Sequence, residues 1–291
     1  MYSPRTKYFV IGAVVIIAVG AALYFWMRPK TPILIQPPIV EVELVRHEVI
    51  GKSVQGRDIE AYTYGTGPKN IVFVGGIHGG YEWNSVMLAY QLVDYFDQNI
   101  STVPSNVTMT IIPVLNPDGV FRVTGKDGRF TLSDVSKDKT ILASGRFNAN
   151  DVDLNRNFDC NWQAKSTWQS KTVSAGTKVF SEPESQVFKK FVEKINPDAV
   201  IFWHSQANSL YASSCGSILP ETKSIMNTYA KASGYPAADT FDSYAVTGDA
   251  GDWLAKIGIP AFEVELKTHE SIEFSQNLAG VKSMLGYFDN R

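Results

Sequence analysis

A set of three apolar runs constrains the fold of this chain more than any other feature. Each run reaches a residue that can bind a metal or carry a proton. IVFVGGIH ends at His78, AVIFWHS contains His204 near its end, and IPAFEVEL contains Glu265 near its end. Continuous apolar runs of this length are typical of strands that are buried on both faces of a sheet. Since open α/β sheets place their sites at the carboxyl ends of strands, we expect these three side chains to lie at that edge.

Strand and helix patterns alternate around these runs. IEAYTYG and VTMTIIPVL are predicted strands, and residues 83–96 have apolar residues at helical spacing. The chain has 291 residues, of which 44% are hydrophobic, so it can bury one substantial core. We therefore predict one globular α/β domain over residues 41–291.

The N-terminal residues 8–27, YFVIGAVVIIAVGAALYFWM, carry no charge. A helix of that length spans about 30 Å of hydrocarbon. This pattern predicts a single transmembrane signal anchor at the cell membrane, with residues 1–7 in the cytoplasm and the domain on the extracytoplasmic side. A cleaved signal peptide is the alternative, although the run exceeds the usual apolar region of one. Residues 28–40 contain several prolines and are predicted to form a spacer.

Two further features bear on the environment of the domain. Cys160 and Cys215 are the only cysteines, and an even count in an exported chain makes a disulfide plausible. Two buried free thiols are the alternative.

The net charge of −2 provides no excess of basic residues for neutralising phosphates, so we expect no nucleic-acid partner.

The histidines indicate a metal site. Two glycines follow His78 and let the backbone turn, so that Glu82 can point back at the same ion. A lone histidine near a glutamate more often forms a structural hydrogen bond, but His204 at a second strand end adds a third ligand. Two histidines and one carboxylate are an open ligand set for catalytic zinc. The remaining histidines, His47 and His269, lie in unremarkable polar surroundings.

Residues 117–180 form a long segment with little periodicity, rich in Gly, Asn, Asp, Ser and Thr. Such segments inside a compact domain are usually functional or disordered.

The motifs HGGYEW, DVDLNRNF, FWHSQ and FEVEL occur in that order, and residues 51–265 and beyond resemble the M14 zinc carboxypeptidase family. The family spaces its first two ligands as His-x-x-Glu, and this chain has one extra residue there.

The resemblance implies a zinc carboxypeptidase-like fold, with a mixed, mostly parallel central sheet flanked by helices. It implies one Zn²⁺ per chain, bound by His78, Glu82 and His204.

The resemblance also implies roles for other residues. Asn155 and Arg156 would hold the terminal carboxylate of the substrate, and Arg146 would stabilise the oxyanion of the scissile carbonyl. Tyr244 would close over the bound substrate, and Glu265 would act as the general base. The alternatives are a solvated loop arginine at position 146 and an ordinary loop aromatic at position 244.

Three more positions bear on specificity. We expect Glu263 to face the opposite side of the sheet from Glu265, so that only Glu265 enters the site. Gly251 falls where the family has an acidic residue for basic substrates or a bulky one for apolar substrates, and it fits neither type. Asp249 could meet the amine of diaminopimelate, although a turn aspartate is the simpler interpretation.

These observations predict a metallocarboxypeptidase that acts on peptides. The main alternative is a peptidoglycan stem-peptide hydrolase of the same family, of the γ-D-glutamyl-diaminopimelate peptidase type, with a muropeptide substrate. An amide hydrolase of N-acyl amino acids and an inactive peptide-binding module are further alternatives. The lipid bilayer is the expected partner of residues 8–27.

Overall fold

The computed structural model describes residues 4–28 and 43–291 of the chain. The chain divides into two units at residues 41 and 42. The first unit contains one helix, α1 (Pro4–Met27), which includes the predicted anchor. Among the described residues, no helix has both the length and the apolar character needed to cross a membrane. The transmembrane prediction for residues 8–27 is therefore not supported. Most of the predicted spacer, at residues 29–40, lies outside the described residues.

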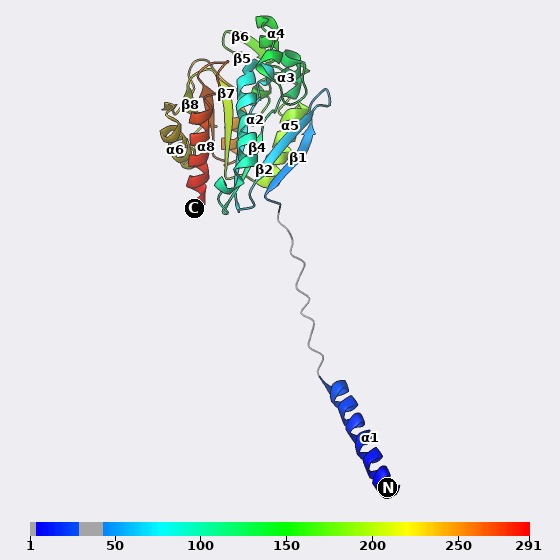
Figure 1. The fold of residues 1–291 in the computed structure, drawn as a ribbon. Coiled ribbons are helices and arrows are strands. Elements are labelled where there is room, and N and C mark those ends of the chain that lie inside the picture. The colour runs from blue at the N-terminus through cyan, green and yellow to red at the C-terminus, as the bar shows by residue number, and fades with distance from the viewer. Residues whose placement is uncertain (1–3, 29–42) are drawn as a thin grey trace. The chain divides into compact units, whose positions relative to one another are not determined.

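An eight-stranded mixed sheet forms the centre of the second unit, in the order β1-β2-β4-β3-β7-β10-β8-β9 (Figure 1). The strands are β1 (Val45–Lys52), β2 (Asp58–Tyr64), β3 (Lys69–Val74), β4 (Val107–Ile112), β7 (Ala199–Ser205), β8 (Ser209–Ala212), β9 (Ala237–Ala238) and β10 (Ala261–Leu266). The four central strands β4, β3, β7 and β10 are parallel. The pairs β1–β2, β2–β4 and β8–β10 are antiparallel. The predicted α/β class and mixed sheet are confirmed.

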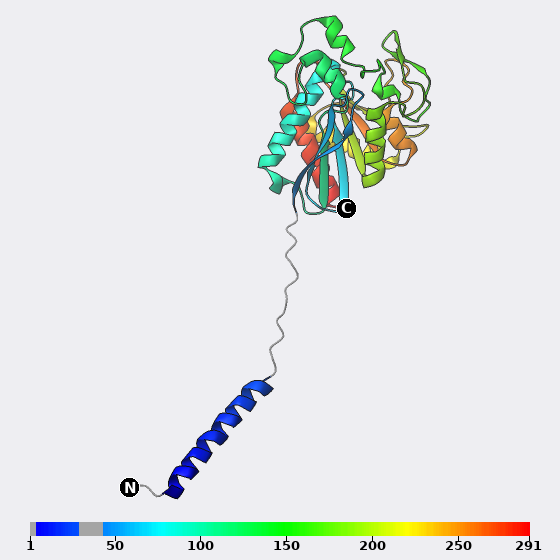
Figure 2. The same cartoon turned by 90° about the vertical axis from the view of Figure 1, so that its right-hand side faces the viewer.

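Helices cover both faces of this sheet, as Figures 1 and 2 show. One face packs against α2 (Trp83–Gln98), α6 (Pro220–Ser233) and α8 (Phe274–Asp289), and the other packs against α5 (Pro183–Ile195) and α7 (Ala250–Lys256). Along β3, Ile71 and Phe73 belong to the first core, whereas Val72 and Val74 belong to the second. Because successive side chains of a strand point to opposite faces, a strand buried on both sides must be apolar throughout.

The segment of residues 117–180 contains short elements that lie above the sheet in Figure 1. They are α3 (Pro117–Thr124), η3 (Leu132–Asp134), α4 (Lys139–Ser144), η4 (Leu154–Arg156) and the hairpin β5 (Lys165–Trp168) with β6 (Lys171–Ser174). The remaining short helices are η1 (Gly79–Glu82), which leads into α2, and η2 (Ile100–Thr102).

A disulfide joins Cys160 to Cys215, which confirms the predicted pairing. Cys160 follows η4 and Cys215 follows β8, so the bridge ties the long segment to the edge of the sheet.

Candidate functional site

Three buried side chains from separate parts of the chain bring their ligand atoms together. His78 follows β3, Glu82 ends η1, and His204 lies in β7. The Nδ1 atoms of the two histidines are 3.2 Å apart. Glu82 Oε1 lies 2.9 Å from His78 Nδ1, and its Oε2 lies 3.1 Å from His204 Nδ1. The predicted ligand set is therefore assembled at the carboxyl ends of parallel strands.

The spacing and the charge of this set fit zinc. Two ligand atoms of a tetrahedral zinc site, each about 2.05 Å from the ion, lie roughly 3.3 Å from one another. Burial lowers the pKa of His204, which favours the neutral imidazole that binds metals. Burial alone would raise the pKa of Glu82, but the imidazoles of His78 and His204 hold it well below its usual range. The set thus offers two imidazole nitrogens and one carboxylate to a dication.

The extra residue between His78 and Glu82 is accommodated by the turn η1. Gly79 has a positive φ of 47°, and a Cβ at this position would lie 2.6 Å from the Gly145 carbonyl oxygen. Only glycine fits both the backbone conformation and this close approach. The insertion therefore leaves Glu82 facing His78, and the departure from the family spacing does not remove the ligand.

A second layer of the site centres on Asp153, whose side chain is 0% exposed. Its Oδ2 accepts a hydrogen bond of 2.7 Å from Arg146 Nε, and its Oδ1 lies 3.5 Å from His78 Nε2. Burial alone would raise the pKa of Asp153, but Arg146, Arg156 and His78 hold it well below its usual range. A carboxylate behind a metal-binding histidine fixes the ring orientation. Asp153 was not among the site residues predicted from the sequence, although it stands two residues before Asn155 in DVDLNRNF.

Arg146 is a buried group of the site and not a solvated loop arginine. Its side chain is 2% exposed, and its guanidinium lies 4.8 Å from the centre of the Trp168 ring. The Nη1 atom is 3.8 Å from Glu82 Oε1, and Nη2 has no hydrogen-bond partner among the described residues. Because an unpaired buried donor is costly, Nη2 is suited to a ligand group that accepts a hydrogen bond there.

Glu265 and Tyr244 line the same pocket as His78 and His204, two of the three candidate metal ligands. Burial, with the nearby charge of Glu82, raises the pKa of Glu265 well above its usual value. Tyr244 is half-buried, with its ring 5.0 Å from that of Phe241.

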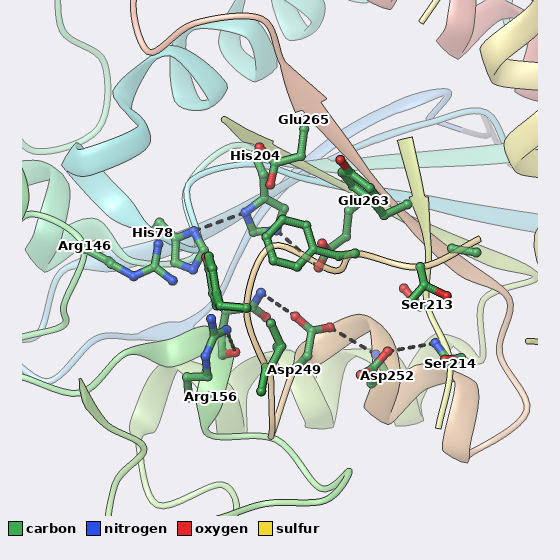
Figure 3. Close-up of a pocket in the computed structure, with 18 residues that line it drawn as sticks. His78, Arg146, Arg156, His204, Ser213, Ser214, Asp249, Asp252, Glu263 and Glu265 are labelled. Atoms are coloured by element: carbon green, nitrogen blue, oxygen red, sulfur yellow. Dashed lines mark hydrogen bonds and ion pairs between the residues drawn. The ribbon is translucent and has the colours of Figure 1, made fainter. Parts of the chain in front are cut away.

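Asn155 and Arg156 also line this pocket. Asn155 Nδ2 donates a hydrogen bond of 2.6 Å to Asp249 Oδ2, and its Oδ1 accepts one of 3.0 Å from Ala250 N. Arg156 donates hydrogen bonds to the carbonyl oxygens of Asn155 and Thr167. These contacts fix both side chains at the wall of the pocket, and Figure 3 shows Arg156 on the same side of the pocket as His78 and Arg146.

The expectation that Glu263 faces away from Glu265 is wrong. Side chains alternate along a strand, so two residues that are two positions apart share a face. Glu263 is paired with Phe202 and Glu265 with His204 in the parallel β7–β10 ladder, and both glutamates line the pocket. Glu263 Oε1 lies 3.7 Å from His204 Nε2.

His269 also lies nearer to the site than its polar surroundings in the sequence indicated. Its Nδ1 is 2.8 Å from Ser205 Oγ, and its ring centre is 4.6 Å from that of Tyr81. Ser205 directly follows the ligand His204, and Tyr81 directly precedes the ligand Glu82. No sequence pattern marks His269, because this contact depends on how the segment after β10 folds back.

Comparison with known proteins agrees with this arrangement. The family model described as zinc carboxypeptidase matches residues 41–277. Gamma-D-glutamyl-L-diamino acid endopeptidase 1 from Lysinibacillus sphaericus is 25% identical over 242 residues, which cover 75% of this chain and 59% of that protein. Carboxypeptidase B from Astacus astacus is 31% identical over 150 residues, which cover 49% of this chain and 47% of that protein. The chain therefore spans only about half of the length of these curated relatives.

A solved structure supports the fold. The murein-tripeptide amidase from Escherichia coli O157 matches with a TM-score of 0.55 and 19% sequence identity, over 82% of this chain and 98% of that chain. At this level of identity the likeness concerns the arrangement of strands and helices.

Proposed function

The chain belongs to the M14 zinc carboxypeptidase family, and from this membership we propose that it is a zinc-dependent metallocarboxypeptidase that removes the C-terminal residue of peptides. One observation carries the proposal. His78 and His204, which form the candidate metal-binding set with Glu82, line a single pocket together with Glu265, a carboxyl group of raised pKa, and with the pair Asn155 and Arg156. Together these residues can bind a metal, transfer a proton and bind the C-terminal carboxylate of a peptide, which are the functions that a carboxypeptidase needs.

The chemistry divides among the residues of the pocket. A bound zinc ion supplies Lewis-acid polarisation and makes a water molecule easier to deprotonate. Glu265 accepts the proton of the attacking water and then transfers it to the leaving amine. Arg146 is held by Asp153, and its Nη2 has no partner among the described residues, so this atom donates a hydrogen bond to the oxygen on which negative charge develops.

The clamp for the substrate terminus is the second part of the proposal. Arg156 presents a guanidinium and Asn155 an amide, and the two together bind the terminal carboxylate. This contact sets the register, because the bond that is cut lies one residue from the carboxylate. Tyr244 then closes over the substrate from the loop that precedes α7.

A second candidate function is hydrolysis of peptidoglycan stem peptides. The similarity to the Lysinibacillus sphaericus endopeptidase, which covers 75% of this chain, favours it. The metal ligands and Glu265 would serve the same steps, and the substrate would be a muropeptide.

We also propose that the domain works outside the cytoplasm, since disulfides such as Cys160–Cys215 persist in oxidising compartments. Attachment to the cell membrane remains a prediction.

Mass spectrometry of the products from a mixed library of peptides and muropeptides tests these proposals. A carboxypeptidase releases single C-terminal residues, and this release must stop when a chelator removes the metal. Matched peptides with an amidated C-terminus are the control for the clamp, and they should be cut far more slowly. Equal cleavage of free and amidated peptides would contradict the assignment of Asn155 and Arg156.

A further inference from the structure

The side of the pocket away from the arginines carries acidic groups. Figure 3 shows Arg146 and Arg156 on one side and Asp252 and Ser213 on the other. Asp249, Asp252 and Glu263 all line the pocket, and Asp249 lies between Arg156 and Asp252 in this view. Within residues 43–291, no lysine or arginine forms an ion pair with any of the three. His204 Nε2 lies 3.7 Å from Glu263 Oε1, and the charge of Arg156 acts on Asp252 without forming an ion pair with it.

Asp249 is already used by the fold. Its Oδ1 accepts hydrogen bonds of 2.7 Å from Gly251 N and 3.1 Å from Asp252 N, which cap the first turn of α7. Its Oδ2 accepts the hydrogen bond from Asn155. The turn interpretation of Asp249 is therefore the right one, and this residue has little capacity left for a ligand.

Asp252 and Glu263 have carboxylate oxygens that can still accept hydrogen bonds from a ligand. Asp252 accepts one hydrogen bond of 2.8 Å, from Ser214 N. Burial, with the charge of Asp249, raises its pKa to about 7. Glu263 has a side chain that is 17% exposed, and its Oε1 has no hydrogen-bond partner among the described residues. Holding these carboxylates close together without a cation is unfavourable.

Ser213 adds an independent sign of a ligand. It is 5% exposed and lines the pocket, yet its Oγ has no hydrogen-bond partner in the described part of the chain. Gly251 lies against it, and a Cβ at position 251 would be 2.1 Å from Ser213 Oγ. Any larger residue at position 251 would therefore displace this hydroxyl, and glycine keeps it open to the pocket. This gives a physical role to a glycine that fits neither family pattern.

We propose that Asp252, Glu263 and Ser213 bind the ammonium group of a lysine-like side chain on the C-terminal residue of the substrate. An ammonium group has three donors and no acceptor, and three oxygen-bearing side chains surround this end of the pocket. The carboxylate of the same residue would meet Arg156 at the opposite side, so the pocket matches both charges of the residue. This inference rests on the proposed function and specifies its substrate. A diaminopimelate side chain brings a second carboxylate, which the acidic groups disfavour.

Matched acylated dipeptides that differ only in the last residue test the proposal on the zinc-loaded protein. The informative pair is lysine and norleucine, which have nearly the same shape and differ by the charge. We expect kcat/KM to be about 10- to 100-fold higher for lysine, the scale of a charged hydrogen bond. Arginine and meso-diaminopimelate substrates show whether a guanidinium or a second carboxylate is accepted.

Two variants test whether Asp252 causes the preference for lysine over norleucine. Asp252→Asn keeps an acceptor for Ser214 N but removes the charge, and it should lower the lysine-to-norleucine ratio about 10-fold, mainly through KM. Asp239→Asn removes an exposed aspartate that pairs with Lys223 on the surface, and it should leave the ratio unchanged. The substrate series on the parent protein does not depend on whether the Asp252 variant folds.

Calorimetry with free L-lysine and L-norleucine separates this inference from the proposed function. Tighter binding of lysine without cleavage of any peptide would refute the carboxypeptidase activity and keep the cation site. Cleavage with equal rates for lysine and norleucine, or a preference for diaminopimelate over lysine, would overturn the cation site and keep the peptidase.

Discussion

Replacing Asp153 by asparagine should damage the site more than any exposed acidic substitution. Asp153 is the partner of Arg146, and both side chains are almost fully buried. Removing one charge of a buried pair typically costs about 3–5 kcal/mol, because the other charge is left uncompensated. Asparagine can still accept the hydrogen bond from Arg146 Nε, and Glu82 lies 3.8 Å from Arg146 Nη1, so we expect the lower value of about 3 kcal/mol.

Urea unfolding of the metal-free protein measures this loss directly. Asp151→Asn is the matched control, since Asp151 stands two residues away, is 81% exposed and pairs with Arg122 at 3.3 Å. Exposed pairs of this kind contribute about 1 kcal/mol or less. A separate competition assay with a chromophoric chelator should show zinc affinity reduced about 10- to 100-fold in Asp153→Asn, because His78 loses its outer partner.

The pH dependence supplies an independent check. The depressed pKa of Asp153 means that its contribution is fully present above the unfolded value of about 3.9 and is lost as pH falls through the folded value. The difference between parent and variant should hold from about pH 8 to pH 5 and shrink below about pH 4. If Asp153→Asn matches Asp151→Asn in stability and in zinc affinity, the role given to Asp153 is wrong.

Three further outcomes are expected. The Glu265→Gln variant should bind zinc and fold like the parent protein, while its kcat falls at least about 100-fold. Activity assays on the zinc-loaded protein measure this fall. An unchanged kcat would show that another residue is the general base. Arg156→Ala should raise KM strongly for peptides with a free carboxylate and leave amidated peptides unaffected, which steady-state kinetics on the two series can compare. Replacing Cys160 and Cys215 together by alanine should lower the free energy of unfolding by about 4 kcal/mol, measured in urea, because the bridge closes a loop of 55 residues.

The parts of the fold that follow from local pattern were predicted from the sequence. The runs that end near His78, His204 and Glu265 are apolar because both faces of their strands are buried, and parallel strands bring their ends to one edge. Glycines after His78 indicated the turn that returns Glu82 to it. These features depend on neighbours in the chain, which a sequence displays.

Other parts depend on contacts between distant segments. Asp153 becomes important only because η4 lies against the turn after β3, and Ser213 only because Gly251 packs on it. Glu263 was misplaced through an error in strand alternation, which the β7–β10 register corrects. The predicted anchor at residues 8–27 rested on the length of that segment and its lack of charge, and the described helices do not support it.

The disulfide has a consequence for how the pocket meets its substrate. Cys160 lies four residues after Arg156, and Cys215 is adjacent to Ser214, so the covalent link limits how far the proposed carboxylate-binding wall and the acidic wall can separate. A ligand that fits both walls finds them preorganised and loses less binding free energy to ordering them. The same rigidity penalises side chains of the wrong length, because the walls cannot adjust to them. We therefore expect the oxidised protein to accept a narrower range of C-terminal residues than the reduced protein.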